Sequence, residues 1–230
     1  MEQGSAAWLD LRARHATTCS EYGNALGIGY VSRQKYMRVK LGLQKADEAN
    51  WMMLAGQERE AWVAEVYFRL MHSCGHPVVL DVDAFCSYAL DRRLGGSVDR
   101  LVSDAHGNRW LLEVKTCPRG NIRDSVPETH SLQMLGLCAI YNLPYAHYIA
   151  STYDKSIFLA EVRWTAGFWE EEIYPRLREF ADWWSVRQMP PRMTNEDKCD
   201  LLKLIRENTI VTEVPALVER MNLVQYMYEV

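Results

Sequence analysis

The stretch GGSVDRLVSDAHGNRWLLEVKT, residues 95–116, predicts a β-hairpin that carries acidic side chains. DAHGN is a typical loop between two strands. Side chains alternate between the two faces of a strand, so Glu113 and Lys115 share one face. The residues Trp110, Leu112 and Val114 give the other face a core. If the loop centres on His106, Asp99 lies directly opposite Glu113.

Two carboxylates that face each other on a sheet destabilise it. They either share a proton or hold a cation. Hard divalent cations such as Mg²⁺ favour an all-oxygen environment, so the pairing of Asp99 with Glu113 predicts a metal site. An alternative stays open, in which Asp99 pairs with Arg100 or Arg109 at an exposed edge and Lys115 neutralises Glu113.

A strong helix is predicted over residues 57–75, ahead of the hairpin. Glu60 lies three residues before Val63 and seven before Tyr67, so it falls on the apolar face of that helix. An acid on a buried stripe needs a partner, and a metal shared with the hairpin would serve. The alternative is a glutamate in the first turn that faces the helix dipole.

Composition indicates one globular domain. The chain has 230 residues, of which 48% are hydrophobic, enough for one substantial core. The net charge of -4 argues mildly against a nucleic-acid binder. Basic residues nevertheless cluster on one predicted helix and after the second hairpin strand, which is compatible either with phosphate binding or with solvated surface. They are Arg33, Lys35, Arg38 and Lys40, and Arg119 and Arg123.

The sequence contains no apolar run of membrane-spanning length and no N-terminal secretory pattern, so an intracellular protein without a membrane span is expected. The six cysteines are scattered and form no CxxC pair. This spacing argues against a zinc finger and against a disulfide framework.

The order of elements predicts an α/β fold with a central mixed sheet flanked by helices. We expect a single domain over residues 1–230, made of a helical N-terminal segment at 1–45, a core at 56–187, and a C-terminal helix and tail at 190–230. A long helix is predicted over residues 168–187, with Pro175 able to kink or divide it.

An acid followed by E-x-K on the next strand, with a glutamate on a preceding helix, resembles the PD-(D/E)xK nuclease superfamily. Further matches resemble one branch of it, the phage lambda exonuclease-like (YqaJ-type) viral recombinase family. The matching positions are Trp8, Arg12, Thr18, Ser20, Leu26 and Gly27, the pattern from Gly56 to Glu60, Ser97 with Asp99, and Gln133. Arg100 departs from the glycine that the family usually has there, and Arg14 competes with Arg12 for the arginine position.

The resemblance implies a restriction-endonuclease-like core and metal-dependent 5′→3′ digestion of linear double-stranded DNA. It implies Mg²⁺, with Mn²⁺ able to substitute, held by Asp99, Glu113, the carbonyl of Val114 and Glu60. It also implies that Lys115 orients or deprotonates water and that Gln133 positions Lys115 or the nucleophile. Arg12 and Ser20 would hold the 5′-phosphate, and the DNA backbone would meet Arg33, Lys35, Arg119 and Arg123.

The partners that the resemblance implies are double-stranded DNA ends, a single-strand annealing protein and two further copies of the chain in a homotrimer. The 3′ overhangs would serve recombination or repair in a phage or virus, in the cytoplasm or in the host cytoplasm or nucleus. Two other functions stay open. One is an endonuclease on DNA or RNA, including a viral nuclease that degrades messenger RNA, and the other is a binding module without activity.

Overall fold

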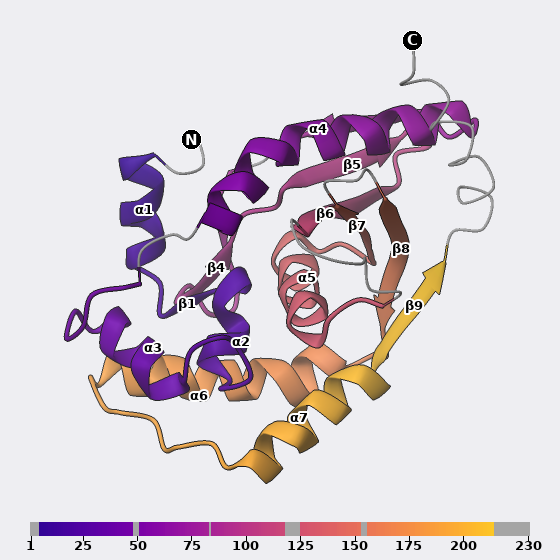
Figure 1. Cartoon of the computed structure of the whole chain (residues 1–230). Helices are drawn as coiled ribbons and strands as arrows, with labels where there is room; N and C mark the ends of the chain where they lie inside the picture. Colours follow the sequence, from indigo (N-terminus) through magenta and orange to yellow (C-terminus); the bar gives the residue numbers. More distant parts are fainter. Residues whose placement is uncertain (1–4, 48–50, 83, 118–124, 153–155, 214–230) are drawn as a thin grey trace.

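A computed structural model describes residues 5–47, 51–82, 84–117, 125–152 and 156–213 (Figure 1). Its centre is a six-stranded sheet in the order β2-β5-β6-β7-β8-β9. Only β6 and β7 are parallel neighbours, and the other pairs in this sheet are antiparallel. The strands are β2 (Val78–Asp81), β5 (Arg100–Asp104), β6 (Arg109–Cys117), β7 (Ala146–Thr152), β8 (Ile157–Trp164) and β9 (Thr209–Glu213).

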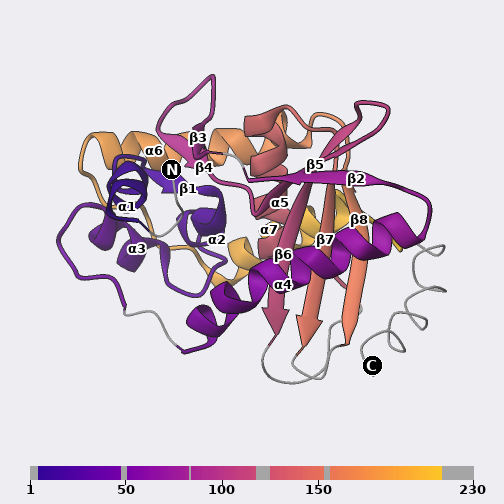
Figure 2. The same ribbon diagram turned by 90° about the horizontal axis from the view of Figure 1, so that it is seen from above.

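Helices cover both faces of this sheet, which confirms the α/β class with a mixed sheet (Figure 2). Helix α4 (Trp51–Ser73) packs on the face that carries Trp110, Leu112 and Val114. Helix α5 (Glu128–Tyr141) packs on the opposite face, which carries Leu111. Side chains that alternate along β6 therefore contribute to a core on each face of the sheet, and the core on the face of Trp110, Leu112 and Val114 is the one that the hairpin sequence predicts.

The N-terminal elements gather beside the sheet (Figures 1 and 2). They are α1 (Ala6–Ala13), β1 (Thr17–Thr18), the 3₁₀ turn η1 (Cys19–Glu21), α2 (Tyr22–Ala25) and α3 (Arg33–Lys40). Ser32 caps α3 by accepting a hydrogen bond from the Lys35 amide, as expected for a serine at this position. Gly27 and Gly42 follow the two helices with positive φ angles of 81° and 72°, where glycine is favoured.

A small second sheet joins these elements to the main one. It has the order β1-β4-β3, with β3 at Cys86–Ser87 and β4 at Leu94–Gly96. Thr18 of β1 pairs with Gly95 of β4, only four residues before Asp99. The sequence predicts only helices over the first 45 residues, so strand β1 differs from the prediction. A strand of two residues is too short to show a periodicity.

The structure corrects three boundaries. Helix α4 begins at Trp51, earlier than the expected residue 57. The predicted helix at 168–187 is divided into a π-helical turn, η2 (Trp169–Ile173), and α6 (Tyr174–Ser185), with Pro175 in the first turn of α6, where its missing N–H is tolerated. After α7 (Asn195–Glu207), the expected tail contains β9, which extends the sheet beside β8.

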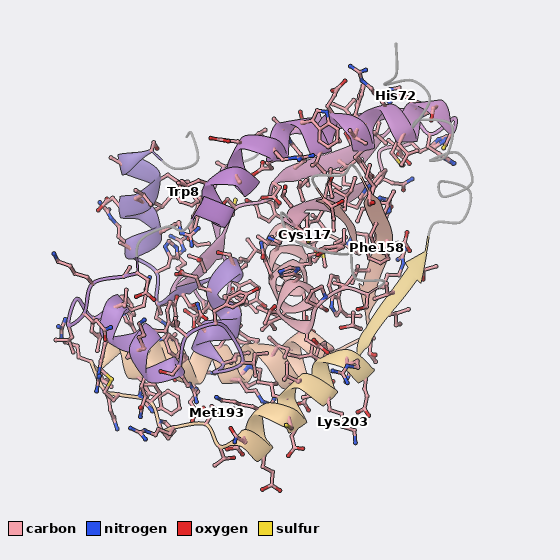
Figure 3. The ribbon with its side chains drawn as sticks, in the orientation of Figure 1. Trp8, His72, Cys117, Phe158, Met193 and Lys203 are labelled. Carbon is pink, nitrogen blue, oxygen red and sulfur yellow. The ribbon has the colours of Figure 1, made fainter. Side chains whose placement is uncertain are left out.

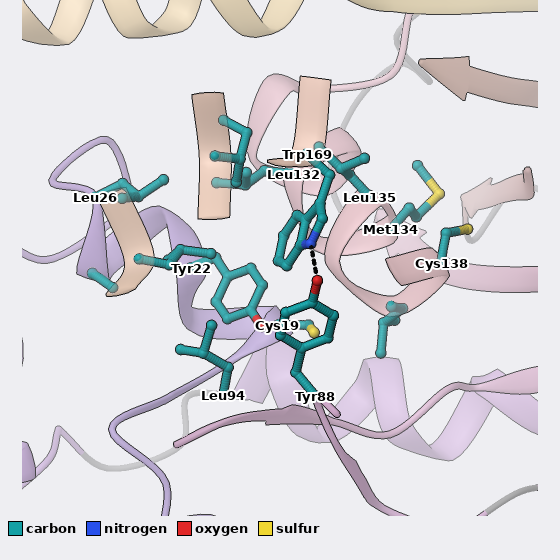
Figure 4. Packing of buried hydrophobic residues seen from close by; sticks show 14 of the residues in the cluster. Cys19, Tyr22, Leu26, Tyr88, Leu94, Leu132, Met134, Leu135, Cys138 and Trp169 are labelled. Carbon is teal, nitrogen blue, oxygen red and sulfur yellow. Dashed lines mark hydrogen bonds between the residues drawn. The ribbon is translucent and has the colours of Figure 1, made fainter. Parts of the chain in front are cut away.

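The larger core lies where α5 meets the N-terminal elements and η2 (Figure 4). The Trp169 indole N–H donates a 3.0 Å hydrogen bond to the Tyr88 hydroxyl, and Tyr22 stacks on Trp169. Gly136 of α5 approaches Tyr22 so closely that a Cβ there would lie 2.3 Å from the ring carbon Cε2. The absence of a side chain at this position therefore sets how near α5 can come to η1 and α2.

No helix in the described part of the chain is both long enough and apolar enough to cross a membrane.

Gly136→Ala should destabilise the protein by about 1–3 kcal/mol, because the added methyl group overpacks a rigid aromatic contact. Urea unfolding followed by circular dichroism measures this. Gly56→Ala is the matched control, since a Cβ at this α4 position meets nothing within 4 Å. Alanine there should stabilise the helix by up to about 1 kcal/mol. Equal stability of Gly136→Ala and the unmodified protein would contradict the packing described.

Candidate active site

The β5–β6 hairpin has the register that the sequence predicts. Arg100 pairs with Leu112 and Leu101 with Leu111, so Asp99, the residue before β5, comes opposite Glu113. Oδ2 of Asp99 accepts a 2.8 Å hydrogen bond from the Val114 amide. The Asp99 carboxylate, one residue before β5 begins, thus accepts a bond of the kind that a backbone carbonyl accepts within a ladder.

Glu113 is fully buried, and only one of its two carboxylate oxygens has polar partners among the described residues. Its Oε1 lies 2.5 Å from Nζ of Lys115 and accepts a 2.6 Å hydrogen bond from Nε2 of Gln133. Lys115 also donates to Oε1 of Gln133 over 3.3 Å. The second oxygen, Oε2, is buried and has no hydrogen-bond partner among the described residues. A buried carboxylate oxygen without a partner is unfavourable, so this atom is suited to binding a cation.

The pKa shifts of Asp99 and Lys115 also favour a bound cation. Burial, followed by the charge of Glu113, holds the pKa of Asp99 well above its ordinary value, and Glu60 adds to the effect. Burial alone would lower the pKa of Lys115, but the carboxylates of Glu113 and Asp99 outweigh it and raise the pKa. Lys115 therefore stays protonated and pairs with Glu113, while burial beside Glu113 disfavours the ionised form of Asp99.

Glu60 lies on α4, across the sheet from Gln133, and its carboxylate is bound by an arginine. Nη1 of Arg100 lies 2.7 Å from Oε1 of Glu60. The same Nη1 also donates to the main-chain carbonyl of Asp99. Since α4 begins nine residues before Glu60, the alternative of a first-turn glutamate facing the helix dipole is wrong.

The residues fit a divalent cation held chiefly by two carboxylates. Asp99 and Glu113 face each other, and the orphaned Oε2 of Glu113 supplies a free ligand atom. Within the described ranges, no three or more Asp, Glu, His or Cys side chains come together as a metal-binding group. Mg²⁺ commonly binds through one or two carboxylates and keeps several waters, so two acids suffice.

A second polar cluster forms at the end of α1. Nη2 of Arg12 donates to Oγ1 of Thr18 over 3.0 Å and to Oγ of Ser20 over 3.2 Å. Nη2 also lies 3.4 Å from a carboxylate oxygen of Glu21. Lys40 of α3 donates to the Arg12 carbonyl over 3.3 Å, so a second cation lies beside the first.

This cluster brings together the predicted Arg12 and Ser20, whereas Arg14 takes another direction. The Arg14 side chain is 72% exposed and pairs with Asp10 on its own helix. Of the two competing arginines, Arg12 is the one that meets Ser20. The pairing of β1 with β4 carries the cluster toward Asp99.

The residues predicted to contact the DNA backbone lie in different surroundings. Arg33 was expected on the surface, but its side chain is only 8% exposed, and its guanidinium lies 4.4 Å from the centre of the Trp183 ring. Burial against α6 removes it from contact with a phosphate backbone. Lys35 forms an ion pair with Asp47 on the exposed side of α3. Arg119 and Arg123 lie outside the described residues.

The sequence does not predict the contacts that Thr18, Lys40 and Arg100 make at the candidate site. Thr18 belongs to the T-x-S pattern, which could have indicated its place beside Arg12. Lys40 was visible in the basic run, but its contact with Arg12 joins residues 28 positions apart. Arg100 was noted as a departure from the family, and no local signal indicated that Glu60 would be its partner.

The fold and the site together define an α/β protein with facing acids and a lysine at the centre of a mixed sheet, and this fold is found in known exonucleases. A solved structure of an alkaline exonuclease (LHK-Exo) from Laribacter hongkongensis superposes with a TM-score of 0.63 at 18% identity, covering 80% of this chain and 94% of that chain. LHK-Exo in complex with dAMP gives a TM-score of 0.61 at 16% identity, covering 77% and 91%. The sequence matches no protein-family model and no curated protein sequence.

Asp99→Asn should stabilise the metal-free protein by about 1 kcal/mol, or roughly 2–4 °C in the unfolding midpoint. The pKa of Asp99 is raised from its ordinary 3.8 in the folded state. Its contribution to stability is therefore complete below pH 3.8 and is lost as the pH rises through the folded-state pKa. The asparagine removes this loss at neutral pH, and thermal unfolding in EDTA measures it.

Mg²⁺ should stabilise the unmodified protein and not this variant, because a ligand that binds only the folded state raises stability. Asp104→Asn, at the last residue of β5, is the control and should keep that response. An Asp99→Asn protein that is less stable in EDTA, and that still responds to Mg²⁺, would contradict the account of the two facing acids.

Proposed function

We propose that this protein is a metal-dependent 5′→3′ exonuclease that acts on linear double-stranded DNA. The observation that carries the proposal is the arrangement of Asp99, Lys115 and Gln133 around the buried Glu113 carboxylate, one oxygen of which has no partner among the described residues. The fold supports it, since LHK-Exo is an alkaline exonuclease. The dAMP complex of LHK-Exo adds that a nucleoside monophosphate binds to that protein.

Asp99 and Glu113 would hold Mg²⁺, with the Val114 carbonyl as a further oxygen ligand, and Mn²⁺ would substitute. When bound, such a cation lowers the pKa of water and stabilises charge on a phosphoryl group. Lys115, kept protonated by its neighbours, orients the attacking water and counters negative charge on the phosphate. Gln133 holds both Lys115 and Glu113, and so fixes the two relative to each other.

The Arg12 cluster would bind the 5′-phosphate of a DNA end. Arg12 and Ser20 present a guanidinium and a hydroxyl to the same point, and charge-assisted hydrogen bonds to phosphate are strong. Lys40 adds a second positive charge beside them. Binding a 5′ end at a fixed place relative to Asp99 would give 5′→3′ digestion and leave 3′ overhangs, which suit recombination or repair in a phage or virus. The proposed partners are a single-strand annealing protein and further copies of the chain in a trimer.

An endonuclease on DNA or RNA is the second candidate, because the acids and the lysine would serve either substrate. The Arg12–Ser20 contact favours the exonuclease, since an internal cut needs no site for a terminal phosphate.

Lys115→Ala should reduce cleavage of linear DNA by about 10²–10⁴-fold, the usual loss for a side chain that positions or transfers a proton. DNA binding, measured by fluorescence anisotropy in Ca²⁺, should remain. Lys203→Ala, an exposed α7 position paired with Glu207 and labelled in Figure 3, is the control. Cleavage by Lys115→Ala at the unmodified rate would refute the role assigned to Lys115.

Linear DNA with a 5′-phosphate should be digested faster than the same DNA with a 5′-hydroxyl, and a closed circle should resist, all with Mg²⁺ and not with EDTA. Arg12→Ala should slow digestion of the phosphorylated DNA by about 10- to 100-fold and abolish its advantage over the hydroxyl form. Arg14→Ala should behave as the unmodified protein, because its guanidinium points away from Ser20.

Cutting of the closed circle would replace the exonuclease by an endonuclease. If no DNA is cut, single-stranded RNA is the next substrate, and inactivity on both would indicate a binding module.

A further inference from the structure

Arg100 joins the two faces of the sheet at the candidate site. Its neighbour Asp99 belongs to the site beside α5, whereas its own side chain points to α4 and Glu60. A single nitrogen, Nη1, is shared between the Glu60 carboxylate and the Asp99 carbonyl. The guanidinium is therefore held to the backbone of a proposed metal ligand.

Burial distinguishes this ion pair from an ordinary surface pair on the same helix. The side chains of Arg100 and Glu60 are 15% and 26% exposed. Glu65 and Arg69, four residues apart on α4, are 49% and 60% exposed and have water as an alternative partner. A mostly buried carboxylate needs a compensating charge, and Arg100 supplies it for Glu60.

The charge of the site then decides how many cations it accepts. When all three carboxylates are ionised, Asp99, Glu113 and Glu60 carry three negative charges against the two positive charges of Lys115 and Arg100, which leaves one negative charge. One divalent cation between Asp99 and Glu113 makes the site singly positive, suited to a phosphodiester. A second cation would need the Glu60 oxygen that Arg100 holds.

We propose that Arg100 is a positioning residue that occupies Glu60 in place of a second divalent cation, so that this protein binds a single metal ion in the absence of DNA. The inference rests on the proposed metal-dependent function and deepens it. Glu60 then acts through Arg100 on the position of Asp99 and is not a direct ligand.

Titration of the purified full chain with Mn²⁺, with free Mn²⁺ followed by electron paramagnetic resonance, tests the proposal. The unmodified protein should bind about one Mn²⁺ and Arg100→Gly about two, because the freed Glu60 can then complete a second oxygen site. Arg100→Gly combined with Glu60→Gln should return to about one. Arg69→Ala, which breaks the exposed pair on the same helix, should match the unmodified protein.

Glu60→Gln alone gives a second, independent measurement should Arg100→Gly fail to fold. Its Mn²⁺ affinity should stay within about threefold of the unmodified value, since Glu60 is not a ligand. A loss of about tenfold or more would make Glu60 a direct ligand and overturn the proposal.

The remaining outcomes separate this inference from the proposed function. Two Mn²⁺ ions on the unmodified protein, or an unchanged number on folded Arg100→Gly, would overturn the role of Arg100 and leave the nuclease intact. If the unmodified protein binds no Mn²⁺, the metal-dependent function fails, and the role of Arg100 fails with it.

Discussion

The hydrogen bond from the Val114 amide to the Asp99 carboxylate is the contact on which the rest of the candidate site depends. This bond extends the ladder of hydrogen bonds between β5 and β6, with the Asp99 side chain as the acceptor in place of a backbone carbonyl. The bond fixes Asp99 against β6 and directly opposite Glu113, so two acids meet in a buried place. Burial, followed by the charge of Glu113, raises the pKa of Asp99, and the same two causes favour a nearby cation.

Three elements distant in the sequence complete the arrangement. Gln133 from α5 joins Glu113 to Lys115, Arg100 joins Asp99 to Glu60 of α4, and β1 brings Arg12 toward the same end of the hairpin through its pairing with β4. These contacts join residues of different elements, whereas Oε2 of Glu113 has no partner among the described residues. A network of this kind is sensitive to small shifts, because an unsatisfied member is expensive to keep buried.

The net charge of -4 is compatible with a nuclease because basic side chains lie beside the acids both at the hairpin site and at the Arg12 cluster. The acids gather in the hairpin site, where a bound cation would reverse the local sign. Arg12 and Lys40 lie together at the proposed end-binding cluster. The buried Arg33 shows in turn that a run of basic residues is a weak guide to a phosphate-binding surface, since one of its members packs on Trp183.

The sequence by itself determined the hairpin register, the two faces of β6 and the cap of α3, because these depend on alternation and on neighbours within a few residues. Only the tertiary structure placed β9 at the sheet edge, buried Arg33 and paired Arg100 with Glu60, a residue 40 positions away. The periodicity of a sequence indicates which side chains are buried, but it does not indicate which of them contact one another. The partner of a buried charge is decided by the packing of helices on the sheet, which no local pattern specifies.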